Sequence, residues 1–414
     1  MKRNLDIQDT AILKALAILA IVFHNFFHQV SPARQNEFTF DPARFGVFLH
    51  AAVRPSMAIQ AFFSFFGHFG VQIFIFLSAY GLSRSHWSDP ASWTSFMCGR
   101  IRKLYPQFAL VVIPWFIVMA LHVRSLAVIA RVGLNVAFQF LGLFPIHGYG
   151  IPPVGPWWFI SFIVEFYAVW PLLRAITNRW GWPGLLVIAS ACLAITYAAN
   201  FSMTSWSMTL LFTPIGRMPV ICFGIFAARY RLRVSAPLAL TGLCVLLLGS
   251  RFAALWPLTF LGALFVALWM YLQVRDTLRR FPLLSCLGDY GLLVFLVNGI
   301  VRDQFVPLAT SPASQLVYGC VSAAVSFAIS AGMYQYLNPK PRAVRALAAA
   351  APATAGEAAH RRLPSGTIGT VPRTAPASTP SARLGSRRPQ PAGADGGRSG
   401  EDLVLSGGFQ HSIR

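Results

Sequence analysis

The stretch AILKALAILAIVFHNFFHQV, residues 11–30, contains only three ionisable side chains, which are Lys14, His24 and His28. A helix of about 20 apolar residues crosses the hydrocarbon core of a bilayer, so this stretch predicts a transmembrane helix. A short polar segment, residues 1–10, precedes it, and no small-residue cleavage site follows. We therefore expect a retained span and not a cleaved signal peptide.

Composition extends this prediction to the whole chain. Hydrophobic residues make up 56% and charged residues only 11%, whereas a soluble domain carries roughly 25% charged residues. The formal charge of +21 is spread over short clusters between apolar runs, which is typical of cytoplasmic loops and excludes a nucleic-acid groove. The six cysteines form no CxxC pair, so we expect small buried hydrophobes and no metal site.

Apolar runs of similar length occur along most of the chain. Eleven candidates lie near residues 11–30, 57–82, 105–122, 125–145, 157–173, 183–199, 207–228, 235–250, 253–273, 283–301 and 315–337. The run at 125–145 is the weakest, because it contains Arg131, Asn135 and Gln139. We predict an all-α, polytopic transmembrane helix bundle of about ten spans, with residues 123–156 extracytoplasmic or re-entrant.

Lysines and arginines decide the orientation, because those in short loops stay in the cytoplasm. Lys2 and Arg3 place the N-terminus there, and the later basic clusters fall on the same side if residues 123–156 do not cross. These observations predict a membrane-embedded domain at 1–340. The Ala-, Pro-, Gly- and Ser-rich basic stretch at 341–414 predicts a disordered cytoplasmic tail, so both termini are expected in the cytoplasm.

Ionisable side chains inside a span are costly and are therefore candidates for function. His24 and His28 are four residues apart and share a helix face. A histidine there can act as a general base, or it can be a hydrogen-bonded residue of the membrane interface. Lys14 lies about 15 Å nearer the cytoplasm and on another stripe of the helix.

Two further charged residues lie deep in predicted spans. Glu165 is the only carboxylate well inside a run, where it either functions or joins neighbouring helices by hydrogen bonding. Arg217 lies between Pro214 and Pro219, two helix breakers that predict the lining of a cavity. An ion pair between Arg217 and Glu165 is the alternative interpretation.

A basic cluster precedes the third candidate span. Arg100, Arg102 and Lys103 stand before Tyr105 and Pro106. Such a cluster is either a topology signal alone or a site for phosphates, since guanidinium forks match phosphate oxygens.

These segments, in this order, resemble the acyltransferase-3 family of membrane acyltransferases. The resemblance covers roughly residues 5–337 and rests on Leu13 to His24, Gly67 to Gly81, Arg100 to Pro106, Trp158 to Pro171, Gly216 to Pro219 and Leu287 to Asn298. His24 falls on the essential histidine of the family. Lys14 stands where an arginine is usual, one residue closer to His24, and Asn298 replaces a usual histidine.

Members of that family O-acylate surface polysaccharides and related glycans. The resemblance implies an acyl-CoA donor, with acetyl-CoA the first expectation, and an acceptor hydroxyl on an exported polysaccharide, a lipopolysaccharide or a lipid-linked sugar. It also implies a bacterial inner membrane protein. On this basis His24 is the expected general base, and Glu165 and Arg217 orient it or the substrate. Arg100, Arg102 and Lys103 are expected to contact donor phosphates.

The resemblance places Lys14, His28 and Asn298 in the substrate cavity. No nucleophilic Ser or Cys constellation is visible, which favours direct transfer over a covalent intermediate. Two alternatives stay open at this point. One is a non-catalytic transporter of a glycan or small solute, built from broken helices and charges at the membrane midplane. The other is a different membrane glycan enzyme, such as a polymerase.

Overall fold

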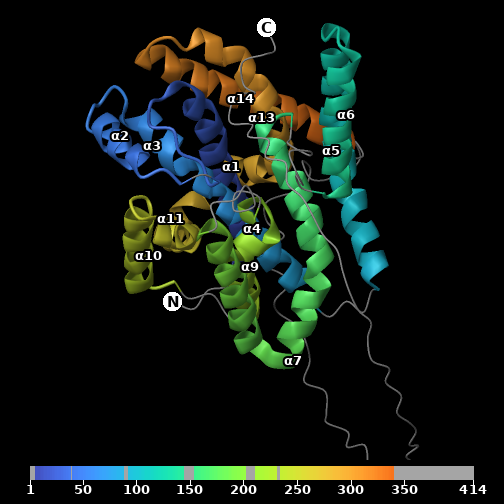
Figure 1. Ribbon diagram of the computed structural model, residues 1–414, viewed down its shortest axis with the longest axis vertical. Coiled ribbons are helices and arrows are strands. Elements are labelled where there is room, and N and C mark those ends of the chain that lie inside the picture. Colours follow the sequence, from blue (N-terminus) through green and yellow to red (C-terminus); the bar gives the residue numbers. More distant parts are fainter. Residues whose placement is uncertain are drawn as a thin grey trace, which may run out of the picture. The chain divides into compact units, whose positions relative to one another are not determined.

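The computed structural model describes residues 5–38, 40–87, 92–143, 153–201, 210–230 and 234–339, which form helices and no strand (Figure 1). The helices are α1 (Ile7–Val30), α2 (Ala43–Ala52), α3 (Ala58–Phe66), α4 (Gly70–Ser85), α5 (Trp93–His122), α6 (Leu126–Leu141), α7 (Trp158–Phe201), α9 (Pro214–Tyr230), α10 (Ala236–Gly249), α11 (Thr259–Leu278), α12 (Pro282–Asp289), α13 (Gly291–Phe305) and α14 (Pro312–Leu337). Short 3-10 turns are η1 (Gly67–Phe69), η2 (Gly155–Trp157), η3 (Ala253–Leu258) and η4 (Val306–Leu308). The predicted tail at 341–414 lies outside the described residues.

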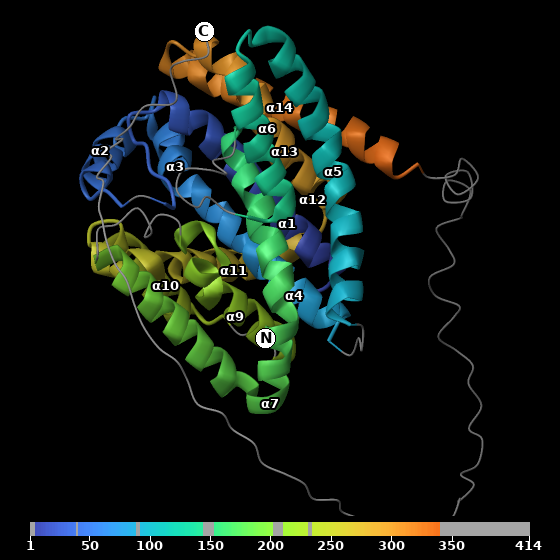
Figure 2. The ribbon, with the colours of Figure 1, turned by 45° about the vertical axis from the view of Figure 1, so that its right-hand side comes forward.

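The predicted all-α membrane bundle is confirmed. Among the described residues, eight helical segments are long and apolar enough to cross a membrane. One of them, Gly155–Ala199, has 45 residues, about twice what one crossing needs. Gly181 interrupts it with φ 64° and ψ −148°, a conformation that favours glycine. Figure 2 shows the two arms of α7 meeting at a bend, so this segment holds the two predicted spans 157–173 and 183–199.

Two predicted runs differ in their details from the observed helices. The run at 283–301 divides into α12 and α13, because Pro282 starts a separate short helix that ends at Asp289. Residues 126–141, inside the segment predicted to be extracytoplasmic or re-entrant, form α6, which packs on α5 and α7. At 16 residues α6 is about 24 Å long, which is shorter than the roughly 30 Å hydrocarbon core.

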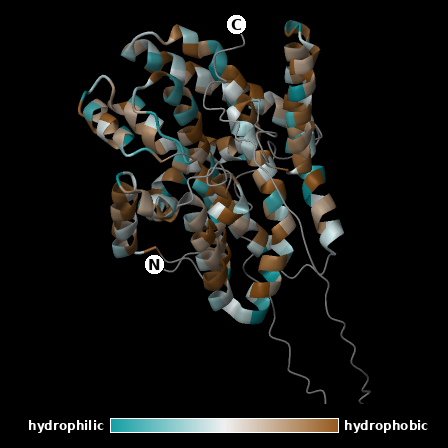
Figure 3. Ribbon diagram, viewed as in Figure 1, coloured by the Kyte–Doolittle hydropathy of each residue, from teal (hydrophilic) through white to brown (hydrophobic). Residues whose placement is uncertain are grey.

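The outer helices expose apolar side chains, as a lipid-facing surface requires. Exposed residues of α5 include Ile113, Ile117 and Leu121, and those of α10 include Leu240 and Leu247. Figure 3 shows apolar residues along most of these helices. A water-soluble helix would carry polar residues at such positions, so the exposed faces are suited to contact with lipid.

Helix α1 lies inside the bundle and contacts α3, α4, α12, α13 and α14. It begins with a capping box in which Asp6 and Asp9 each accept a hydrogen bond from the other's backbone N–H. Asp9 is fully buried and also accepts hydrogen bonds from Tyr271 Oη at 2.6 Å and Arg275 Nε at 2.7 Å. Arg279 pairs with both aspartates. These contacts fix the N-terminal end of α1 to the C-terminal end of α11.

Candidate functional site

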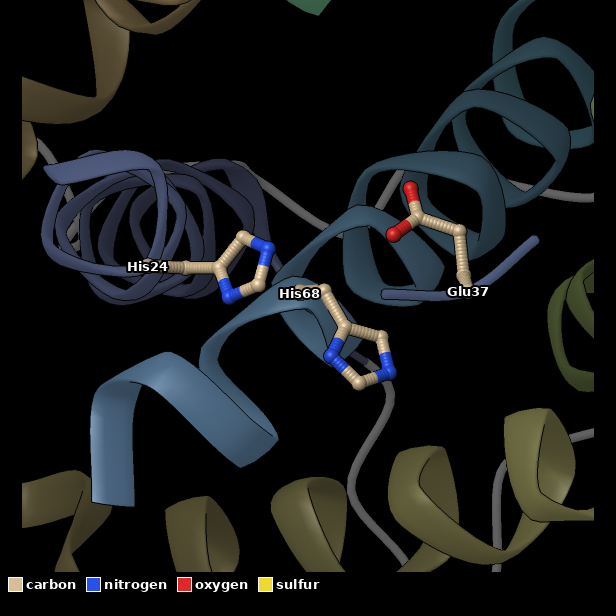
Figure 4. A group of neighbouring side chains, drawn as sticks. All are labelled: His24, Glu37 and His68. Carbon is tan, nitrogen blue, oxygen red and sulfur yellow. The ribbon is translucent and has the colours of Figure 1, made fainter. Parts of the chain in front are cut away.

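Four ionisable side chains meet near the other end of α1. They are His24 on α1, Glu37 in the following loop, His68 on η1 and Arg217 on α9. The ring nitrogens of the two histidines and a carboxylate oxygen of Glu37 lie within 4.8 Å of one another. Figure 4 shows His24 projecting from α1 toward the segment that carries His68, with the carboxylate of Glu37 beyond it. We call these four residues the buried cluster.

Backbone geometry holds the imidazole of His24 in place. Its Nδ1 lies 3.2 Å from the carbonyl oxygen of Phe63 on α3. Because a carbonyl oxygen only accepts, Nδ1 is the protonated nitrogen in this contact, and Nε2 keeps its lone pair. The ring is 93% buried and its centroid lies 5.1 Å from that of His28 and 5.3 Å from that of His68. His24 therefore presents a proton acceptor inside a packed histidine group.

A glycine allows η1 to come this close to α1. A Cβ on Gly67 would lie 2.6 Å from the carbonyl oxygen of Ala20 and 2.7 Å from Cβ of His24. Any larger residue at position 67 forces the two segments apart. The next residue, His68, then lies buried against Phe69, with ring centroids 4.1 Å apart. Neither ring nitrogen of His68 has a hydrogen-bond partner of good geometry among the described residues.

A carboxyl group, that of Glu37, and a cation, the guanidinium of Arg217, form the other side of the buried cluster. Glu37 is 4% exposed and Arg217 is fully buried. Burial raises the pKa of the Glu37 carboxyl to about 7, although the positive charge of Arg217 opposes the shift. Near neutral pH this carboxyl therefore exchanges a proton easily.

Only one of the three guanidinium nitrogens of Arg217 forms a hydrogen bond with a described residue. Its Nε donates to the carbonyl oxygen of Leu211 at 2.8 Å, and its plane lies over the ring of Phe260 at 3.9 Å. Nη1 and Nη2 are buried and have no hydrogen-bond partner among the described residues. Two unused donors on a buried cation can stabilise a negative charge that develops beside them.

Asn298 joins α13 to α1 beside the cluster. Its Oδ1 accepts a hydrogen bond from Asn25 Nδ2 at 2.7 Å, and its own Nδ2 donates to the carbonyl oxygen of Val294 at 3.0 Å. Arg302, one turn further along α13, lies close enough to His24 and His28 to act on both electrostatically. Asn298 thus lies at the edge of the site, where it fixes a helix and is fully paired.

The remaining predicted residues lie elsewhere. Glu165 is half-buried on α7 and has no hydrogen bond or ion pair with another described residue. Lys14 faces Asp289 of α12, toward the opposite end of α1. The charge nearest to Arg217 is that of Glu37, which takes the place that one interpretation of the sequence gave to Glu165.

The three basic residues of α5 differ in burial and in their contacts. Arg100 is half-buried, and its Nη2 donates to Nε2 of His86 at 2.5 Å. Arg102 and Lys103 are exposed. Successive residues of a helix are rotated by about 100°, so Arg102 points away from the face of Arg100, whereas Lys103 lies about 60° from it but is exposed.

Two members of the buried cluster were not identified from sequence. Glu37 lies in a loop, outside the apolar runs in which charged residues draw attention. His68 stands inside a motif that was noted only for its glycines and apolar residues. The sequence does contain a feature that could have identified Glu37. It is one of only 13 acidic residues in the chain, and it follows closely after the first span.

The donor set of His24, Glu37 and His68 is one that a metal ion can use, although the sequence predicted no metal site. Ligand atoms that share a tetrahedral zinc ion lie about 3.4 Å apart, given bonds of about 2.1 Å. The ligand atoms here all lie within 4.8 Å of one another, but the charge of Arg217 beside Glu37 opposes a second cation. The arrangement is better suited to holding one small organic substrate between a proton acceptor, a carboxyl group and a cation.

Comparison with known proteins decides the family. A family model described as an acyltransferase domain matches residues 8–334. The chain belongs to the acyltransferase-3 family. The matched region of this acyltransferase includes every residue of the buried cluster. Neither the curated proteins nor the solved structures contain a significant match to the chain.

Proposed function

We propose that this acyltransferase moves an acyl group, acetyl in the simplest case, from a cytoplasmic acyl-CoA-type donor to a hydroxyl of a cell-surface or exported carbohydrate. We place it in the inner membrane of a bacterium, with both termini in the cytoplasm. The observation that carries the proposal is the orientation of His24 within a family of acyltransferases. The Phe63 carbonyl engages Nδ1, so Nε2 is available as a base within the buried cluster.

The reaction needs one proton acceptor and one cation. As the acceptor hydroxyl oxygen bonds to the thioester carbonyl carbon, its proton passes to Nε2 of His24. The negative charge that forms on the carbonyl oxygen is stabilised by Nη1 and Nη2 of Arg217. The carbon–sulfur bond then breaks, and the departing thiolate takes the proton back from His24. No covalent acyl-enzyme is required.

The other residues have supporting roles in this scheme. Glu37 balances the charge of Arg217, and the ring of His28 packs beside that of His24. Asn298 holds α13 against α1, and Lys14 lies on the path toward the cytoplasm. Glu165, half-buried on α7, lies outside the buried cluster and has no part in this step. Burial excludes water, which prevents hydrolysis of the thioester.

The direct test is transfer of radiolabel from acetyl-CoA to the glycan fraction of membranes that contain the chain. We expect the wild-type chain to label the glycan and His24→Gln to lose transfer by at least about a hundred-fold, at equal protein level. Glycan analysis of a deletion strain should show a missing ester. Full transfer by His24→Gln would remove His24 from the mechanism. A glycan that crosses the membrane without gaining an ester would instead support the transporter alternative.

A further inference from the structure

Three arginines from three helices surround the two residues that follow α4. Arg100 on α5 donates through Nη2 to Nε2 of His86 at 2.5 Å, and Arg174 on α7 donates through Nη1 to the carbonyl oxygen of the same residue at 3.3 Å. The guanidinium of Arg229 on α9 lies over the ring of Trp87 at 4.3 Å. We call these three residues the arginine triad.

Among the described residues, aromatic side chains surround the triad. Trp87 packs edge-on against Trp170, with ring centroids 6.2 Å apart, and Arg100 lies over the ring of Phe96 at 5.6 Å. Neither Arg100 nor Arg229 forms an ion pair with another described residue. The positive charges of Arg100 and Arg229 are therefore not neutralised by the carboxylates that the structure describes.

One donor of the triad has no partner. Nε of Arg100 is buried and makes no hydrogen bond with any described residue. A buried donor without a partner costs about 1–3 kcal/mol, which a ligand oxygen can recover. Guanidinium groups that are held in place by packing are well suited to phosphate oxygens, because their planar forks bind two oxygens at once.

The triad and the buried cluster lie at opposite ends of α4. His68 lies two residues before the start of this helix, and His86 directly follows its end. The 16 residues of α4 correspond to a length of about 24 Å along the helix axis. A coenzyme A thioester has its phosphates at one end and its thioester at the other, joined by a long flexible pantetheine arm. The spacing of the two sites is that of the two ends of such a molecule.

We propose that Arg100, Arg174 and Arg229 bind the phosphates of the acyl-CoA-type donor at the cytoplasmic face of the membrane. This proposal rests on the proposed function and names the donor site for it. The adenine ring is bound against the aromatic side chains beside the triad. Anionic lipid headgroups also carry phosphate, but they lack the nucleotide and the pantetheine arm that would extend toward His24.

The test is binding of coenzyme A to the full-length chain in zwitterionic detergent, measured by thermal stabilisation. Coenzyme A is compared with pantetheine, which lacks phosphates, and with nanodiscs that contain phosphatidylglycerol. We expect coenzyme A to stabilise the wild-type chain and pantetheine to bind at least about ten-fold more weakly. Arg174→Gln and Arg229→Gln should each weaken coenzyme A binding at least about ten-fold. Arg251→Gln, an exposed arginine between α10 and η3, is the matched control and should bind normally.

Kinetics separate this proposal from the proposed function. In the acyl-transfer assay, Arg229→Gln should raise KM for acetyl-CoA with little change in kcat, and Arg229→Lys should recover part of the loss. Normal coenzyme A affinity in both glutamine variants would overturn the proposal, whatever the acyl-transfer result. Stabilisation by phosphatidylglycerol alone, with no effect of coenzyme A, would also overturn it. Coenzyme A binding that depends on the triad, without acyl transfer, supports the donor site and counts against the proposed function.

Discussion

Asn25 donates a hydrogen bond from Nδ2 to Oδ1 of Asn298, 2.7 Å away. The bond joins α1 to α13 directly beside His24, and Nδ2 of Asn298 is already engaged by backbone carbonyl oxygens of its own helix. Removing Asn25 therefore leaves one buried oxygen without a donor, in a place where water does not replace it. The position of His24 depends on this pairing, because the two residues are adjacent in α1.

We expect Asn25→Ala to reduce the free energy of unfolding by about 1–3 kcal/mol and to lower acyl transfer. Thermal unfolding in detergent and the transfer assay measure the two effects. The matched control is Asn338→Ala, because Asn338 is exposed at the end of α14 and donates only to the backbone of that helix. Equal unfolding temperatures for the two variants would contradict a structural role for the Asn25–Asn298 bond.

Glu37 predicts a pH dependence of stability. Its pKa rises from an ordinary value of 4.5 to about 7 in the folded chain. Between these two values the folded state binds more protons than the unfolded state, so stability is greatest below pH 4.5 and falls until about pH 7. A shift of about 2.5 units corresponds to about 3 kcal/mol.

Glu37→Gln has no proton to lose, so we expect its unfolding temperature to fall less than that of the wild-type chain between pH 5 and pH 7.5. Parallel thermal unfolding of both proteins across this range makes the measurement. Asp41→Asn, an exposed carboxylate in the same loop, should follow the wild-type profile. If Glu37→Gln also follows the wild-type profile, the carboxyl of Glu37 is ionised over the whole range from pH 5 to pH 7.5. Burial then does not raise its pKa.

Asp9 is the only carboxylate that meets both Tyr271 and Arg275 in the described structure. Replacing it with asparagine removes the nearer counter-charge of the buried Arg275 and leaves Asp6 at 3.8 Å. Breaking a buried pair costs up to about 3–5 kcal/mol. We expect Asp9→Asn to lower the unfolding temperature strongly, while Asp303→Asn, at an exposed ion pair, changes it little. A double variant with Arg275→Met should recover stability, because neither charge is then left alone. Failure of the double variant to recover would argue against the ion pair as the cause.

The sequence was sufficient to predict the helical membrane bundle. A long run of uncharged, apolar residues can be recognised from neighbouring residues alone, without knowledge of the tertiary fold. It also drew attention to His24, His28 and Arg217 as ionisable residues in apolar surroundings, and the structure places all three in or beside the buried cluster. Glu37 was missed because its burial is created by the tertiary fold. Its own segment is polar, and nothing near it in sequence indicates that α9 will bring Arg217 to it.

The same reason explains the arginine triad. Arg174 and Arg229 were read from the sequence as signals of orientation, which is what most arginines at helix ends are. Only the packing of α5, α7 and α9 around residues 86–87 brings them together. Conversely, Arg102 and Lys103 neighbour Arg100 in the sequence but are exposed, whereas Arg100 is half-buried against His86. Proximity in sequence was therefore a poor guide to which basic residues share a site.

Gly67 provides the most specific test of the buried cluster, because its replacement changes the distance between η1 and α1 and leaves every ionisable side chain in place. Alanine at this position adds a single methyl group, which would lie within 3 Å of Ala20 and His24, so η1 must move away from α1. No ionisable group is removed. Reaction rates depend steeply on the position of catalytic groups, and we therefore expect Gly67→Ala to reduce kcat by about ten-fold or more, with a smaller effect on KM.

Gly81→Ala is the matched control for Gly67→Ala. Gly81 belongs to the same membrane span, and a Cβ there meets no atom within 4 Å. Alanine in an open helical position stabilises by up to about 1 kcal/mol, so this variant should keep full activity and unfold at the same temperature or slightly higher. Wild-type kcat in Gly67→Ala would mean that the spacing between His24 and His68 is unimportant for transfer. In that case His24 would act without His68, and the catalytic scheme would reduce to His24 and Arg217.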